Sequence, residues 1–260
     1  QKTLDRLHRL EPIYAKIFTS LLRNRIYTYL LQNEYIETDI QKGFWSGISG
    51  TVEHTELLSH MINHARRYQR SMVVTLLDLR NAFGEVDHNL IQCVLDYHHI
   101  PNTVKNLVSE LYKDYTISIG TKSFTTNPIY VRKGVLQGDC LSPLLFNMCF
   151  NTLIKCIEHE KIKMIGYCFS DSLQPRHWFQ FADDTALATT TEEDNQALLN
   201  VFSKWSTWAK FKIRIDKCLT FGIKKNGKVS TQYKSYVLVS NEMIPTVDIE
   251  NSFEYLGKLF

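Results

Sequence analysis

Two adjacent acids stand at the tip of an apolar hairpin that the sequence predicts near residue 183. Residues 178–181 (Trp-Phe-Gln-Phe) and 185–188 (Thr-Ala-Leu-Ala) read as two short strands, with Asp183 and Asp184 at the turn. Carboxylates are costly to remove from water unless a cation neutralises them. The pair therefore predicts a metal ion at the hairpin tip. The alternative interpretation is an Asp-Asp turn without a catalytic role.

A third acid follows a predicted buried strand about a hundred residues earlier. Residues 73–77 (Val-Val-Thr-Leu-Leu) form an apolar run, and Asp78 follows directly. If this strand and the hairpin are neighbours, three carboxylates converge on one point, as in a two-metal phosphoryl-transfer site. Because neighbouring side chains on a strand point to opposite faces, Asp183 and Asp184 are expected to have unequal roles, with Asp183 as the main ligand.

The residues after Asp78 are candidates for nucleotide binding. If a nucleoside triphosphate lies on metals held by Asp78, the backbone amides around residues 80–82 can bind its phosphates, and the ring of Phe83 would lie under the sugar. A rigid ring there leaves no room for a 2′-hydroxyl, so the product would be DNA. Alternatively, Phe83 is a core residue at a strand end. The proposed phosphate-binding residues are Arg80, Asn81 and Ala82.

A glycine-punctuated loop, residues 134–141, leads into a helix that is expected to begin at Ser142-Pro143. Glycine lets the backbone approach a base pair or a template strand closely. The amide of Gln137, next to Gly138, can then hydrogen-bond the incoming nucleotide. Glycine-rich loops before helices are also common in proteins without this function.

Other elements follow from periodicity and capping residues. Helices are expected over residues 1–32, 52–69 and 87–97, and from residues 102 and 191, with a hairpin over 115–131 and a type I′ turn at Asn226-Gly227. This mixture predicts an α+β sheet covered by helices on one face. The last helix is expected to turn one apolar set inward: Leu198, Val201, Phe202, Trp205 and Trp208.

In this order and spacing, the motifs resemble those of reverse transcriptases, and more closely those of the non-LTR retrotransposon branch. The resemblance covers nearly the whole chain. Residues 41–44 with 47–51 look like that branch's fingers motif, and residues 77–83, 134–146 and 181–184 match motifs A, B and C, with Phe for the more usual Tyr in the last. Residues 216–218 resemble motif D. The primer-grip motif has its counterpart in Tyr255, Leu256 and Gly257.

The resemblance implies a right-hand polymerase of the α+β class, whose antiparallel palm sheet is backed by helices. Fingers would cover residues 1–72 and lack their N-terminal part. The palm would cover residues 73–260, with an inserted fingers segment around 100–133. The sequence stops directly after the primer grip, so the thumb is expected to be absent from it. It begins with Gln1 rather than Met, so we expect it to be a piece of a longer protein.

The resemblance also implies an RNA-directed DNA polymerase with two Mg²⁺ ions, or Mn²⁺ as a substitute. The metal ligands would be Asp78, Asp183 and Asp184, and Lys217 would protonate the departing pyrophosphate. The partners would be an RNA template, a DNA primer and dNTPs. Many relatives clamp the triphosphate with an arginine where Trp45 stands, and Lys42 or Arg80 are candidates to replace it.

Two other functions compete with this one. A reverse-transcriptase-like fold can serve as a catalytically silent RNA-binding or assembly scaffold, but such a scaffold would be expected to lose a metal-binding acid. An RNA-dependent RNA polymerase shares the palm, but it usually carries, where Phe83 stands, a group that accepts the ribose hydroxyl. Both alternatives therefore rank below the DNA polymerase.

Composition excludes a disordered chain and does not by itself indicate a polyanionic partner. The chain has 260 residues, of which 44% are hydrophobic, so it can bury a full core, and its net charge of +3 is mild. The basic stretch over residues 203–234 could follow a phosphate backbone or could be a solvated face.

Six cysteines without a C-x-x-C pair indicate neither a disulfide framework nor a zinc site. No run approaches the roughly 18 apolar residues of a membrane span, and no signal peptide opens the chain. The protein is expected to be intracellular, and nuclear if it comes from a eukaryotic retroelement. Its oligomeric state stays open.

Overall fold

The computed structural model describes residues 13–45, 47–121, 123–136, 138–159, 162, 164–170, 172–248 and 251–260. The chain divides into two compact units. The first unit contains the residues up to Ile36 together with Asn81–Phe150, and the second unit contains Glu37–Arg80 together with Asn151–Phe260. Each unit is therefore assembled from segments that are distant in the sequence. The division into fingers and palm stays a prediction.

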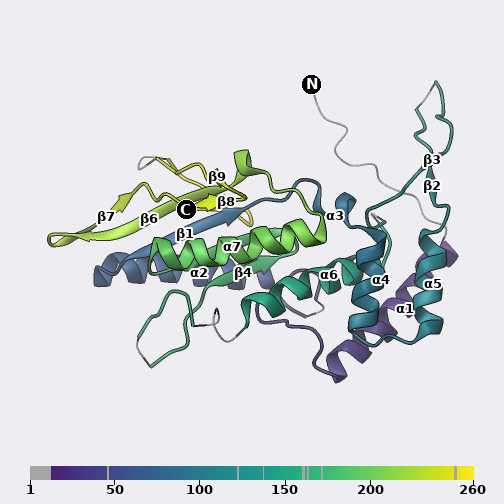
Figure 1. Cartoon of the computed structure of the whole chain (residues 1–260), viewed down its shortest axis with the longest axis horizontal. Coiled ribbons are helices and arrows are strands. Elements are labelled where there is room, and N and C mark those ends of the chain that lie inside the picture. The colour runs from purple at the N-terminus through teal and green to yellow at the C-terminus, as the bar shows by residue number, and fades with distance from the viewer. Residues whose placement is uncertain are drawn as a thin grey trace. The chain divides into compact units, whose positions relative to one another are not determined.

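The second unit contains an antiparallel sheet with the strand order β4-β5-β1-β6-β7 (Figure 1). β1, the apolar run before Asp78, is buried along its whole length and lies at the centre. This arrangement confirms the α+β class and the antiparallel sheet. The strands are β1 (Met72–Leu77), β4 (Trp178–Phe181), β5 (Asp184–Thr189), β6 (Leu219–Asn226) and β7 (Val229–Tyr233).

Helices cover both faces of this sheet. Val74 of β1 belongs to an apolar core that includes the buried side of α2 (Gly50–Tyr68). Thr75, the next residue, donates a hydrogen bond to Asn195 of α7 (Glu192–Ala209) at 2.8 Å. Because neighbouring residues on a strand point to opposite faces, α2 and α7 lie on opposite sides of the sheet. The expectation that helices cover only one face is therefore wrong.

α7 begins and packs largely as its sequence predicts. The Thr191 side chain accepts a hydrogen bond from the Asp194 amide at 3.1 Å, and acids fill the first turn, where the helix dipole favours negative charge. Trp208 differs from the prediction, since 58% of its surface is exposed. The predicted residues that are buried are Leu198, Phe202 and Trp205.

The first unit is mostly helical. Asp87 caps α4 as expected, because its side chain accepts a hydrogen bond from the Asn89 amide at 2.8 Å. α6 starts at Ser142 as predicted, but the cap is Asp139, whose side chain accepts hydrogen bonds from the Leu141 amide at 3.1 Å and the Ser142 amide at 3.0 Å. The elements are α1 (Ile13–Gln32), α3 (Ala82–Glu85), α4 (His88–Tyr97), α5 (Asn102–Tyr112), β2 (Thr116–Ile117), β3 (Ile129–Tyr130) and α6 (Ser142–Ile157), which continues into the second unit.

Short hairpins complete the second unit. They pair β8 (Leu238–Val239) with β9 (Glu242–Met243), and β10 (Glu254–Tyr255) with β11 (Lys258–Leu259). The β6–β7 turn differs from the predicted Asn-Gly type I′ turn, because Asn226 pairs with Val229 and the turn residues are Gly227 and Lys228. Over the described residues, no helix combines the length and apolar character needed to cross a bilayer.

Candidate active site

The strand pairing brings the three acids to one end of the sheet. β1 and β5 pair so that Leu77 lies opposite Thr185, and continuing this register places Asp78 opposite Asp184. β4 and β5 pair up to Phe181 and Asp184, which leaves Ala182 and Asp183 as the turn between them. The strand and the acidic hairpin are therefore neighbours, as the three-carboxylate hypothesis requires.

The turn itself separates the two adjacent acids. Ala182 has a φ of +56°, a left-handed conformation that residues other than glycine rarely adopt. Asp183 is half-buried within the turn, whereas Asp184 is exposed and is the first residue of β5. The acids thus do not follow regular strand alternation, and their unequal settings agree with the expectation of unequal roles. Whether Asp183 is the main ligand stays a prediction.

Negative neighbours oppose the ionisation of both acids of the hairpin. Although Asp184 as a whole residue is exposed, partial desolvation of its carboxyl group raises its pKa from 3.8 to about 6, and the charges of Asp183 and Asp78 add to the effect. The pKa of Asp183 is also raised, first by burial and then by Asp78, although its own backbone amide lowers it. Negative charge is therefore concentrated at this end of the sheet, and a cation there would be stabilised.

Asp78 has two basic neighbours, of which the sequence interpretation identified Lys217 but missed Arg214. Arg214 Nε lies 3.9 Å from Asp78 Oδ1, and the Arg214 amide donates to the Asp78 carbonyl at 2.9 Å. Burial raises the pKa of Asp78, while Arg214 and then Lys217 lower it. Lys217 is exposed and ends the short 3-10 helix η1 (Ile215–Lys217). The only sequence signal for Arg214 was its place in the basic stretch, two residues before motif D.

The residues present fit a hard divalent cation by their chemistry. Magnesium prefers carboxylate oxygens, and Asp78, Asp183 and Asp184 supply only such donors. Over the described part of the chain, no three His, Cys, Asp or Glu side chains are yet grouped tightly enough to form a metal cluster. Repulsion between the carboxylates disfavours such close grouping unless a cation compensates it. The acids therefore match the metal in donor type and lie on neighbouring segments, and their oxygens would have to converge around it.

The raised pKa of Asp184 predicts a stability gain when this charge is removed. Between pH 4 and 6 the folded chain binds more protons at Asp184 than the unfolded chain, so this group makes stability fall as the pH rises through that window. Asp184 is partly solvated, so we expect Asp184→Asn to add only on the order of 1 kcal/mol at pH 7.5, or about 2–4 °C in Tm.

Thermal unfolding at pH 4 and pH 7.5 in metal-free buffer measures this effect. The gain should be present at pH 7.5 and vanish near pH 4. Asp248→Asn is the matched control, because its exposed carboxylate lies 2.9 Å from Lys234 and its removal should not raise Tm. An equal gain in both variants, or no gain at pH 7.5, would contradict the interpretation.

The predicted nucleotide-binding residues fall in both units. The Arg80 amide donates to Lys212 O at 2.8 Å, so it is already engaged, and the exposed Arg80 guanidinium is the better candidate to reach a phosphate. The chain passes from the second unit to the first between Arg80 and Asn81. Asn81 is exposed with a φ of +47°, and Ala82 is buried at the start of α3.

Within the first unit, the end of motif A, at Phe83, contacts the start of motif B, at residues 134 and 135. The Val135 amide donates to Phe83 O at 2.8 Å, and a Cβ added at Gly134 would lie 2.9 Å from Gly84 Cα. This close approach explains the glycine at position 134, whose φ of +94° also favours glycine. Gly138 is exposed with a φ of +93°, and Gln137 lies outside the described residues.

The predicted primer grip is a hairpin anchored on the sheet. Leu256 and Gly257 form its turn with φ values of +50° and +78°, the pattern of a type I′ turn. The buried Tyr255 hydroxyl donates to Phe179 O at 3.2 Å on β4, and burial followed by the charge of Asp184 raises its pKa. This hairpin therefore lies on the same unit as the acids and within electrostatic reach of one of them.

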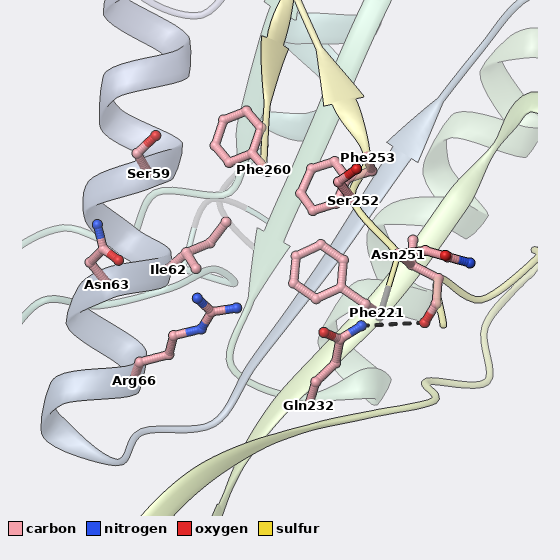
Figure 2. A pocket seen from close by; sticks show the side chains of 11 residues that line it. Ser59, Ile62, Asn63, Arg66, Phe221, Gln232, Asn251, Ser252, Phe253 and Phe260 are labelled. Carbon is pink, nitrogen blue, oxygen red and sulfur yellow. Dashed lines mark hydrogen bonds between the residues drawn. The ribbon is translucent and has the colours of Figure 1, made fainter. Parts of the chain in front are cut away.

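Three aromatic rings, those of Phe221, Phe253 and Phe260, pack the hairpin against the sheet. The Phe253 ring stacks on Phe260 at 5.1 Å and packs on Phe221 of β6 at 4.9 Å, and the three rings line a cavity of about 340 Å³ beside α2 (Figure 2). On the rim of this cavity, Gln232 Nε2 donates to Val247 O at 3.3 Å. The three rings fix β10 and β11 on the sheet that carries the acids.

The fingers-motif segment lies along the edge of the sheet, which the sequence interpretation missed. The Lys42 amide donates to Gln180 O at 2.9 Å, and the Gln180 amide donates to Ile40 O at 3.2 Å, so this segment pairs with β4. Lys42, a candidate for the triphosphate clamp, pairs instead with Glu53 at 2.7 Å. The only available signal was the Gln-Lys-Gly-Phe motif itself.

Comparisons with known proteins agree with the geometry. A family model described as "Reverse transcriptase (RNA-dependent DNA polymerase)" matches residues 6–259. The Pol polyprotein of retrotransposable element R2DM from Drosophila melanogaster is 26% identical over 84% of this chain and 20% of its own length. A Pol polyprotein of element R2 from Popillia japonica is 31% identical over 85% of this chain and 30% of its own length. The chain thus spans a third or less of these two relatives.

Solved structures show the same fold. A truncated apo telomerase from Candida tropicalis matches with a TM-score of 0.58 at 11% identity, over 92% of this chain and 43% of that one. A telomerase from Candida albicans, solved with a fragment of telomeric RNA, matches with a TM-score of 0.53 at 12% identity, over 91% of this chain and 38% of that one. The fold is that of a right-hand polymerase, and the chain belongs to the reverse transcriptase family.

Proposed function

We propose that the protein containing this chain is an RNA-directed DNA polymerase of a retroelement, or of a gene derived from one. It transfers a nucleotide from a dNTP to the 3′-hydroxyl of a primer. The observation that carries this proposal is the meeting of Asp78 with the acidic hairpin at one end of the sheet, in a member of the reverse transcriptase family. Phosphoryl transfer depends mainly on positioning and charge neutralisation, and clustered carboxylates serve both through bound cations.

Asp78, Asp183 and Asp184 would hold two Mg²⁺ ions, with Mn²⁺ as a substitute. Bound there, the metal would activate the primer hydroxyl and neutralise charge on the triphosphate and the departing pyrophosphate. Lys217, whose charge acts on Asp78, would give its proton to the leaving group. The exposed Arg80 guanidinium would neutralise a phosphate.

The proposed partners are an RNA template, a DNA primer and dNTPs. The fold is shared with telomerases, one of which was solved in complex with a fragment of telomeric RNA, and this supports RNA as the template. Gln137 and Gly138 of motif B would contact the incoming nucleotide or its template base. The hairpin of Tyr255, Leu256 and Gly257 would hold the primer end. A site of action inside the cell, and in the nucleus of a eukaryotic host, belongs to the same proposal.

Primer extension with the full-length protein tests this function. An RNA template with an annealed DNA primer should be extended with dNTPs in Mg²⁺ and not with NTPs. A chelator should abolish extension, and excess Mg²⁺ should restore it, because the carboxylates need the cation to bind the triphosphate. Extension with NTPs would indicate an RNA polymerase. RNA binding without any incorporation would indicate a catalytically silent scaffold.

A further inference from the structure

We propose that Gln41 is a positioning residue for the acidic pair. Its side-chain amide holds the backbone of Ala182, and through it the turn from which Asp183 and Asp184 project. The catalytic consequence of this contact rests on the proposed polymerase function, whereas the contact and its effect on the turn do not. Gln41 lies in the second unit with the acids, although it is 141 residues away from Ala182 in the sequence.

The contact is bidentate. Gln41 Nε2 donates to Ala182 O at 3.0 Å, and the Ala182 amide donates to Gln41 Oε1 at 2.8 Å. The Gly43 amide also donates to Oε1, at 2.9 Å. These partners fix the orientation of the side-chain amide, because a flipped amide would place donor against donor and acceptor against acceptor. One buried side chain thus satisfies both backbone groups of the residue at the start of the turn.

Gln41 is itself held in place from several sides. Only 1% of its surface is exposed, and its carbonyl accepts a hydrogen bond from Trp45 Nε1 at 2.7 Å. His54 Nε2 lies 3.0 Å from Ile40 O and 3.1 Å from Gln180 O, so it joins the fingers-motif segment to β4. Burial lowers the pKa of His54, and a neutral ring with the proton on Nε2 suits both carbonyls. The side chain is therefore a rigid support for the turn.

The turn needs such a support because Ala182 is in a left-handed conformation. This conformation costs an alanine roughly 1–2 kcal/mol, and it persists only where the surroundings over-determine it. Around Ala182, those surroundings are the Gln41 amide and Gln180 Nε2, which donates to Ala182 O at 3.1 Å. Without Gln41, the Ala182 amide loses its acceptor while it stays buried, and the turn is free to relax.

Gly43 provides a second way to test the same contact. A Cβ added at Gly43 would lie 2.5 Å from Ala182 N, 3.0 Å from Gln41 Oε1 and 3.2 Å from Ala182 Cα. Contacts of this length with backbone atoms cannot be relieved by rotation of a flexible side chain. Gly43→Ala should therefore push the Ala182 backbone away from Gln41 without removing the Gln41 side chain.

Hydrogen exchange measures the contact directly, without any catalytic assay. In Gln41→Met, which keeps the side-chain length, the Ala182 amide should exchange at least about 10-fold faster, while the amides of residues 185–189 keep their protection. Asn195→Leu is the matched control, because it removes another buried amide whose Oδ1 accepts from Thr75 at 2.8 Å. That variant should lower Tm without selectively exposing Ala182. Equal exchange at Ala182 in the wild type and in Gln41→Met would overturn the proposal.

Metal binding and turnover then measure the consequence for the acids. Titration of Mn²⁺ by electron paramagnetic resonance, without substrates, should show about 10- to 100-fold weaker binding in Gln41→Met and in Gly43→Ala of the full-length protein. Raised Mg²⁺ should partly rescue their kcat in primer extension. Gly120→Ala, where a Cβ would meet only Thr125 Oγ1 at 3.8 Å, should bind Mn²⁺ as the wild type does.

The outcomes separate this proposal from the polymerase proposal. Faster Ala182 exchange and weaker Mn²⁺ binding support the positioning role even if the wild type extends no primer. Unchanged Mn²⁺ affinity in both variants of an active protein would refute the role and leave the polymerase function standing. A loss of Tm alone, with exchange and affinity like the Asn195→Leu control, would reduce Gln41 to a general contributor to stability.

Discussion

Asp183→Asn is expected to lower the rate of primer extension by at least about 10³-fold while the protein stays folded. The asparagine side chain keeps the size of Asp183 but removes one charge from a site where Asp78 raises the pKa of both hairpin acids and Asp183 raises that of Asp184. Less negative charge means weaker binding of the cations that would neutralise the triphosphate. Asp78→Asn should have a similar effect, because Asp78 extends the central strand into the same site.

Pre-steady-state nucleotide addition by the full-length protein at saturating Mg²⁺ measures this loss. Asp248→Asn is the control: it removes one exposed carboxylate of the same unit, away from the acidic hairpin in sequence and paired with Lys234. Its rate should stay within about twofold of the wild type. If Asp183→Asn retained more than a tenth of the wild-type rate, the three-acid site would be wrong, and other groups would have to hold the catalytic cations.

The central part of the site could be predicted because its signals are local. The apolar run that ends at Asp78 can hardly be anything but a buried strand, and Asp183 with Asp184 interrupts two short strands at a turn. That the strand and the hairpin are neighbours was the hypothesis on which the three-acid site depended. The antiparallel register confirms it, because it places Asp78, one residue beyond β1, next to Asp184 at the start of β5.

The support of the site could not be predicted because it is not local. The Gln41 amide meets Ala182 across 141 residues, and no periodicity or capping rule links two such positions. The fingers motif was read as a part of the fingers alone, yet it pairs with β4 in the unit of the sheet. A glutamine and a glycine two residues apart are ordinary in a loop, and only the fold gives them their role.

Other differences come from burial and from turn geometry. Trp208 follows the helical spacing of the inward residues of α7, but the last turn of that helix leaves it exposed. The β6–β7 turn uses Gly227 and Lys228, because the register of the two strands decides which residues form the turn. The Arg80 amide is paired with Lys212 through the strand extension beyond β1. Each of these outcomes depends on contacts made by other segments.

Phe83→Ala is expected to relax the choice between deoxyribose and ribose by about 10- to 100-fold, because a pocket that excludes one hydroxyl by shape gains or loses discrimination of this size. The Phe83 ring is half-buried and stacks on Phe146 at 4.1 Å with an angle of 4° between the planes, and Phe146 stacks on Phe150 at 4.5 Å. The row holds the ring rigid, which exclusion by shape requires.

The ratio of kcat/KM for a dNTP to that for the matching NTP, measured on an RNA template, reports this choice. Phe150→Leu is the control, because it loosens the same aromatic row at its far end while leaving the Phe83 ring in place. It should lower Tm and keep the ratio. A ratio unchanged in Phe83→Ala would assign Phe83 to the core of the first unit and leave DNA as the product without a structural reason. A ratio that falls only in Phe83→Ala ties the sugar choice to this ring, since a general loosening of the row would move both variants together.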